Sequence, residues 1–152
     1  MLYQLRNLTD SERSTILNAP VWVTLLIACA DNDLNAEEIK KAAKVIHARS
    51  FSEESDVRDL YKELDEDFDH LVQIEINNLP LMGDERITQL VENLKKLNDI
   101  LPKLENSYAA KFHQSLTKLA SLVAQADGGF LGIGSISYKE AEYIKLPMIS
   151  KP

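Results

Sequence analysis

Two similar acidic segments lie near opposite ends of this 152-residue chain. The first, residues 28–38, reads Ala-Cys-Ala-Asp-Asn-Asp-Leu-Asn-Ala-Glu-Glu. The second, residues 124–140, begins Ala-Gln-Ala-Asp-Gly-Gly and ends Ile-Ser-Tyr-Lys-Glu. Carboxylate oxygens are hard ligands that suit Ca²⁺, Mg²⁺ or Mn²⁺. If folding brings the two segments together, their acids predict a site for one of these divalent cations.

The candidate metal ligands are Asp31, Asp33, Glu38, Asp127 and Glu140. Four of them come from equivalent positions of the two segments, and Asp33 adds a further oxygen ligand two residues after Asp31. When Asp31 is aligned with Asp127, the apolar residues before them also match. The step from Asp to Glu is 7 residues in the first segment and 13 in the second, so the second loop carries a six-residue insertion. Each segment therefore predicts a helix-loop-helix corner.

The same residues also have an explanation that needs no metal. Asn35 and Ser137 are good helix N-caps, and a Glu follows each of them three residues later, which is the capping-box pattern. Such a box stabilises a helix by about 1 kcal/mol. The two corners are therefore interpreted either as a cation site or as structural corners alone.

The composition predicts an ordinary globular protein. Apolar residues make up 45% of the chain, with five Gly and five Pro, so residues 1–152 are expected to form a single domain. No apolar run reaches the roughly 18 residues that span a bilayer, and no signal peptide is recognised. A lone cysteine, Cys29, suits the cytoplasm. The net charge of −7 argues against nucleic-acid binding.

Apolar residues recur at helical spacing along the chain and not at strand spacing. The pattern predicts an all-α bundle of about seven helices with two pseudo-repeated corners. Thr9 and Glu12 form a capping box that opens a short first helix, and Pro20 is expected at the first position of the second. The remaining helices are predicted over about 36–49, 52–77, 83–101, 102–126 and from 138 onward.

At the two corners the chain resembles the tellurite-resistance TerB-like family. Its members carry Ala-Asp-Gly, a short loop and a Glu at the start of the next helix, typically twice. The matching residues here are Ala30-Asp31-Asn32 with Glu38, and Ala126-Asp127-Gly128 with Glu140. The resemblance implies a compact helical bundle with a divalent-metal site at these acids, in a cytoplasmic protein of tellurite resistance or stress response. The chain departs from the family by Asn32 in place of Gly and by its long second loop.

Two other segments are candidate surfaces for a protein partner. The acidic segment 53–69 holds nine acids against Arg58 and Lys62, and it includes Glu66 one turn before His70. A solvated acidic helix face explains this segment best. The loop 129–136 is unusual for a flexible insertion because it carries apolar residues, Phe130 and Leu131 among them. It either packs on the bundle or docks a partner.

The leading interpretation is therefore a non-enzymatic TerB-like domain, with no catalytic residue assigned. It binds a divalent cation weakly or engages another protein. The first alternative is a metal-free interaction or scaffold module. A less favoured alternative is a metal-assisted hydrolase, which needs a metal-bound water at an open coordination position. The sequence predicts neither the oligomeric state nor the identity of an ion or partner.

Overall fold

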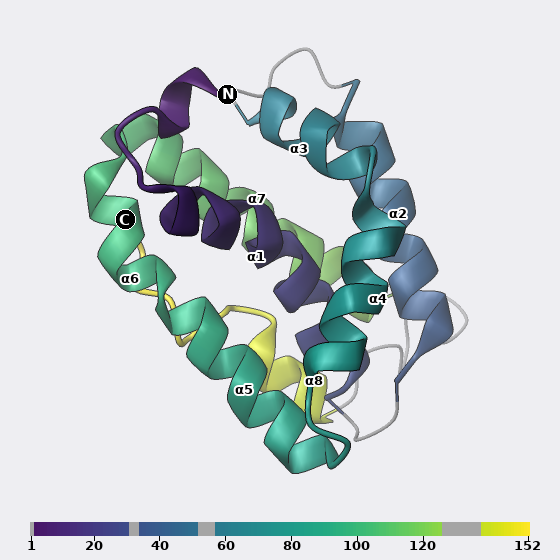
Figure 1. Ribbon diagram of the computed structural model, residues 1–152. Helices are drawn as coiled ribbons and strands as arrows, with labels where there is room; N and C mark the ends of the chain where they lie inside the picture. The colour runs from purple at the N-terminus through teal and green to yellow at the C-terminus, as the bar shows by residue number, and fades with distance from the viewer. Residues whose placement is uncertain (1, 31–33, 52–56, 126–137) are drawn as a thin grey trace.

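A computed structural model describes residues 2–30, 34–51, 57–125 and 138–152 (Figure 1). Within these ranges the chain forms eight α-helices and two short 3-10 helices and contains no strand. The predicted all-α bundle of about seven helices is therefore confirmed, since one of the eight, α6, is a single turn. Both candidate corners are flanked by helices, as predicted.

Helix α1, Asp10–Ala28, is the central element. It packs against α2 (Ala36–Arg49), α4 (Phe68–Asn78), α5 (Gly83–Lys95) and α7 (Asn106–Ala124), as Figure 1 shows. Every residue from 20 to 30 is buried, because neighbours cover this helix on several sides. A sequence that is apolar nearly all round is what such a position requires.

Helix α1 begins where the sequence predicts, but it continues past the point where a new helix was predicted. The Thr9 side chain accepts from the Glu12 amide, and the Glu12 carboxylate accepts from the Thr9 amide, so the predicted capping box is present. The prediction that a second helix begins at Pro20 was wrong, because Pro20 lies inside α1. A proline costs about 3 kcal/mol in a helix interior. The adjacent Ala19 and Val21 are both fully buried, and the free energy gained by packing this part of α1 in the core offsets that cost.

The segment 52–77 was predicted as one helix, and its described part forms two. Helix α3, Arg58–Asp65, is followed by its C-cap Glu66, and α4 starts at Phe68. In the turn between α3 and α4, the Asp67 amide donates a hydrogen bond to the Leu64 carbonyl at 3.1 Å. The apolar residues that recur at helical spacing in this segment, here called the apolar stripe, include Leu60, Leu64 and Phe68. All three are buried, so the stripe stays on the buried face across the break.

The second half of the chain is also more divided than its periodicity indicates. Helix α5 is followed by α6, Leu97–Ile100, and by a 3-10 turn, Leu101–Lys103. Helix α7 begins only at Asn106, four residues after Pro102, where a helix start was predicted. Helix α8, Tyr138–Tyr143, begins where expected and packs against α1.

A buried polar network joins α2, α3 and α7. The Arg49 guanidinium donates to the Tyr61 hydroxyl at 2.9 Å and to the Ser115 carbonyl at 2.7 Å. The Tyr61 hydroxyl donates to Ser115 Oγ at 2.8 Å, and Ser115 Oγ donates to the Phe112 carbonyl at 2.7 Å. Because each buried polar atom named here is paired, the network avoids the penalty of unsatisfied groups and holds the three helices in one register.

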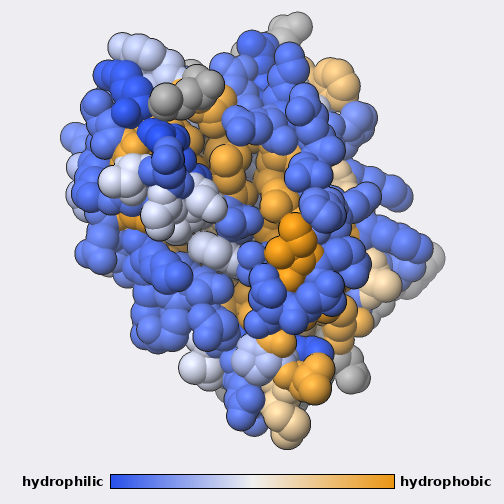
Figure 2. Space-filling model, in the orientation of Figure 1, coloured by the Kyte–Doolittle hydropathy of each residue, from blue (hydrophilic) through white to orange (hydrophobic). Residues whose placement is uncertain are grey.

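The surface is mainly polar. Figure 2 shows a largely hydrophilic face on which hydrophobic residues appear in seams and at scattered positions. The exposed large apolar side chains among the described residues include Phe51, Leu81 and Met82. No helix in the described ranges is long and apolar enough to cross a membrane.

Candidate functional site

The first corner is closed by hydrogen bonds between the end of α1 and the start of α2. The Asn35 amide donates to the Ala28 carbonyl at 3.2 Å. The Asn35 side-chain oxygen accepts from the amides of Glu37 and Glu38 at 3.0 and 3.1 Å. Asn35 is therefore the N-cap that the sequence predicts, and it holds the first turn of α2 beside the end of α1.

Glu38 is a buried member of this corner. Only 1% of its surface is exposed, although Glu is rarely buried to this degree in proteins. Burial raises the pKa of the nearby Cys29 thiol, Arg86 opposes the rise, and the charge of Glu38 adds to it. The position of Glu38 in the first turn of α2 suits a negative charge, because the amide end of the helix dipole lies there. The Glu38 carboxylate thus faces the end of α1 and not solvent.

The side chains of the other four predicted ligands lie outside the described part of the chain. Asp31 and Asp33 fall in 31–33, and Asp127 falls in 126–137, so all three lie outside the described residues. Glu140 lies in the first turn of α8, with its side chain outside the described part. Loop 129–136, the candidate docking segment, also lies outside the described residues.

The helices that lead into the two corners run in the same direction. Lys103, just before α7, forms an ion pair with Glu12 in the first turn of α1. The two helices pack against each other, and each has 19 residues (Figure 1). Helix α2 returns from the end of α1, and its last residue, Arg49, reaches Ser115 in the middle of α7. The ends of α1 and α7, at Ala28 and Ala124, therefore lie at the same end of the bundle.

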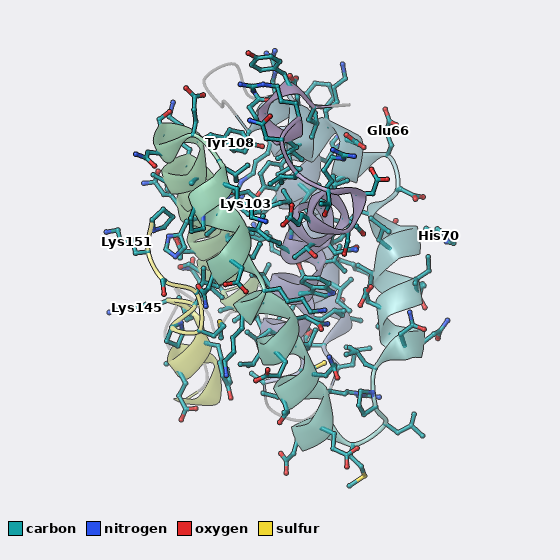
Figure 3. The ribbon with its side chains drawn as sticks, turned by 60° about the vertical axis from the view of Figure 1, so that its left-hand side comes forward. Glu66, His70, Lys103, Tyr108, Lys145 and Lys151 are labelled. Atoms are coloured by element: carbon teal, nitrogen blue, oxygen red, sulfur yellow. The ribbon has the colours of Figure 1, made fainter. Side chains whose placement is uncertain are left out.

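The acidic segment is a solvated surface in its described part, 57–69. Asp59 and Glu63 on α3 and Asp69 on α4 are exposed. Figure 3 shows Glu66 and His70 both extending outward from this side of the molecule. In the part of the chain that the structure describes, no three His, Cys, Asp or Glu side chains are grouped closely enough to hold a metal ion.

A group of lysines that the sequence analysis did not single out lies elsewhere. Lys111 on α7 and Lys145 and Lys151 after α8 line one pocket of about 690 Å³. Lys111 and Lys145 are far apart in sequence, so periodicity carries no signal for their proximity. The sequence shows only that the chain has a net charge of −7, and this does not indicate where lysines gather.

The chain matches no family model, no curated protein and no solved structure. The assignment of a function therefore depends on the residues and their arrangement.

Proposed function

We propose that this chain is a non-enzymatic, TerB-like helical domain that binds a divalent cation at the end of the bundle where α1 and α7 finish. The observation that carries the proposal is the parallel, equal-length pairing of these two helices. Asp31 follows one helix end by three residues and Asp127 follows the other by three residues. The two corners thus start from neighbouring helix ends.

The buried Glu38 supports the same proposal. Glu38 is 1% exposed at the start of α2, and its negative charge acts on Cys29, the C-cap of α1, so it lies at the end of the bundle where the first corner is formed. Its position between α1 and α2 is that of a ligand contributed by the first corner, while Asp31 and Asp33 would supply further oxygens. Carboxylates at both corners would suit Ca²⁺, Mg²⁺ or Mn²⁺. A cytoplasmic role in tellurite resistance or stress response, as the resemblance implies, is part of the proposal.

Calorimetry and thermal unfolding with CaCl₂, MgCl₂ and MnCl₂ test it. A cation present at 100 times its Kd adds about 2.7 kcal/mol to the free energy of unfolding. For a chain of this size that corresponds to roughly 5–10 °C in Tm. The double variant Asp31→Asn with Asp127→Asn should lose both the binding heat and the shift.

The control variant is Asp59→Asn with Asp69→Asn, which removes two acids from the exposed surface of α3 and α4. It changes the net charge by the same amount and should bind the cation as wild type does. Absence of heat and of a Tm shift in the wild-type protein would reject the cation site. An equal loss in both double variants would assign the effect to general charge.

The second candidate function is a metal-free interaction module. The exposed acids of α3 and α4 favour it, because they form a negatively charged surface that suits a basic partner. The control variant named above also tests this alternative. It should weaken binding of a Lys/Arg-rich peptide, whereas Asp31→Asn with Asp127→Asn should leave that binding unchanged.

A further inference from the structure

The pocket of about 690 Å³ lies between α7 and the segment that follows α8. Its volume is within the range of about 300–1,000 Å³ that small-molecule sites occupy. Residues from two parts of the chain line it: Ala110, Lys111, His113, Gln114, Thr117, Ile144, Lys145, Lys151 and Pro152. Among the described residues, none that lines the pocket belongs to the two acidic corners, so an inference about the pocket is independent of the proposed cation site.

The charged side chains among the described lining residues are all cationic, against the net negative charge of the whole protein. Three of them are lysines, and none of the described lining residues is Asp or Glu, although the chain carries a net charge of −7. Figure 3 shows Lys145 and Lys151 on the same side of the molecule, both from the C-terminal segment. Lys145 and Lys151 carry like charges and line one hollow, so an anion bound between them would relieve their repulsion.

The C-terminal segment is held in place and does not lie loosely on the surface. The Asn98 side chain donates to the Met148 carbonyl at 3.0 Å and accepts from the Ser150 amide at 2.7 Å. Leu146 is fully buried and has a φ of 50°, in the left-handed region that non-glycine residues rarely adopt. Burial and these hydrogen bonds offset the strain, and the result is that Lys145 and Lys151 both reach one pocket.

His113 is one of the residues that line the pocket. It is 9% exposed, and its Nε2 atom is buried without a hydrogen-bond partner among the described residues. Burial lowers the pKa of His113, and the charge of Lys151 lowers it further. The imidazole is therefore neutral near pH 7, and Lys151 is close enough to act on it electrostatically. A ligand that enters the pocket will change the surroundings of this ring.

We propose that this pocket binds a small organic phosphate ester, with the phosphate held by the lysines and the organic part against Ala110, Ile144 and Pro152. A phosphate dianion matches several ammonium groups better than a carboxylate, which carries a single charge. Lysine is a common phosphate ligand and acts as a point charge that needs no fixed planar geometry. Exposed lysines also make the binding dependent on ionic strength.

Phenyl phosphate is the probe for this proposal, followed by NMR of the His113 ring and of the α7 amides in wild-type protein. Saturable shifts at these positions are expected, and they should weaken as salt is raised. Inorganic phosphate should bind more weakly than phenyl phosphate because it lacks the apolar part. Benzoate should also bind more weakly because it has one charge.

The variant Lys145→Gln with Lys151→Gln should weaken phenyl phosphate binding by about 2- to 30-fold, the effect of two exposed ion pairs. The matched control is Lys44→Gln with Lys62→Gln, two exposed lysines outside the pocket, which should bind as wild type does. Absence of saturable shifts, equal weakening by the control, or benzoate binding as tightly as phenyl phosphate would overturn the proposal. So would binding to phosphatidic acid vesicles without binding to phenyl phosphate, because the ligand would then be a membrane surface.

Discussion

The carboxylate of Glu12 and the ammonium of Lys103, 91 residues apart in sequence, form an ion pair between the starts of α1 and α7. This contact shows that α1 and α7 run in the same direction, because it lies at the N-terminal ends of both helices. The two Ala-Asp corners consequently begin from the same end of the bundle.

Glu12 has a lowered pKa, mainly because Lys103 hydrogen-bonds its carboxylate and secondly because the Thr9 amide does so. Lys103→Gln should therefore raise the pKa of Glu12 toward its ordinary value, which NMR titration of the carboxyl carbon measures. A group with a lowered folded-state pKa contributes stability above its unfolded pKa and loses it as pH falls through the folded pKa. The acid side of the stability curve should accordingly flatten in the variant. An unchanged Glu12 pKa would show that the ion pair does not form in solution.

Removal of the Tyr61 hydroxyl should destabilise the fold. Tyr61→Phe leaves Arg49 and Ser115 Oγ each without one buried partner, and the expected cost is about 1–3 kcal/mol in the free energy of unfolding. Tyr3→Phe is the matched control, because Tyr3 is 69% exposed and the variant should unfold as wild type does. Denaturant unfolding measures both variants. Equal stability of Tyr61→Phe and wild type would mean that the network does not hold the helices together.

The pKa of His113 should respond to Lys151. Burial lowers this pKa first, and the positive charge of Lys151 lowers it further. Lys151→Gln removes the second cause, so the pKa should rise while staying below the ordinary value for histidine. A pH titration of the His113 ring resonances measures this, with Lys62→Gln as the control. If the two variants titrate alike, Lys151 does not face His113.

Loss of the Asn98 side chain should release the C-terminal segment. Asn98→Ala removes the hydrogen bonds to the Met148 carbonyl and from the Ser150 amide. Amide exchange at Ile149 and Ser150 should become faster, because local opening no longer breaks these bonds. Phenyl phosphate binding should weaken as Lys145 and Lys151 lose their fixed positions. Asn78→Ala, at an exposed position at the end of α4, should change neither property.

Local patterns predicted where most helices lie and which of their faces are buried. The Thr9 capping box and the Asn35 cap form as expected, because each depends on residues within a single turn. The apolar stripe through Leu60, Leu64 and Phe68 is buried as predicted, since helical spacing alone places these residues on one face. The break between α3 and α4 was not predicted, because a short turn can keep the stripe on the same face.

Packing decided what local patterns could not. Pro20 favours a helix start by its own geometry, yet burial against neighbouring helices keeps α1 continuous through it. The burial of Glu38 depends on how α2 meets α1, and no single-residue preference predicts it.

For the candidate sites too, the sequence indicated some residues and only tertiary packing placed the others. The acids of the two corners were recognisable as a repeated pattern in the sequence. The repeat led to the expectation that folding brings the two corners together, but the contact that marks the parallel pairing of α1 and α7, between Glu12 and Lys103, was not predicted. The lysine pocket joins Lys111 to Lys145 and Lys151. Contacts between residues so distant along the chain depend on tertiary packing, so only the folded structure could place these side chains together.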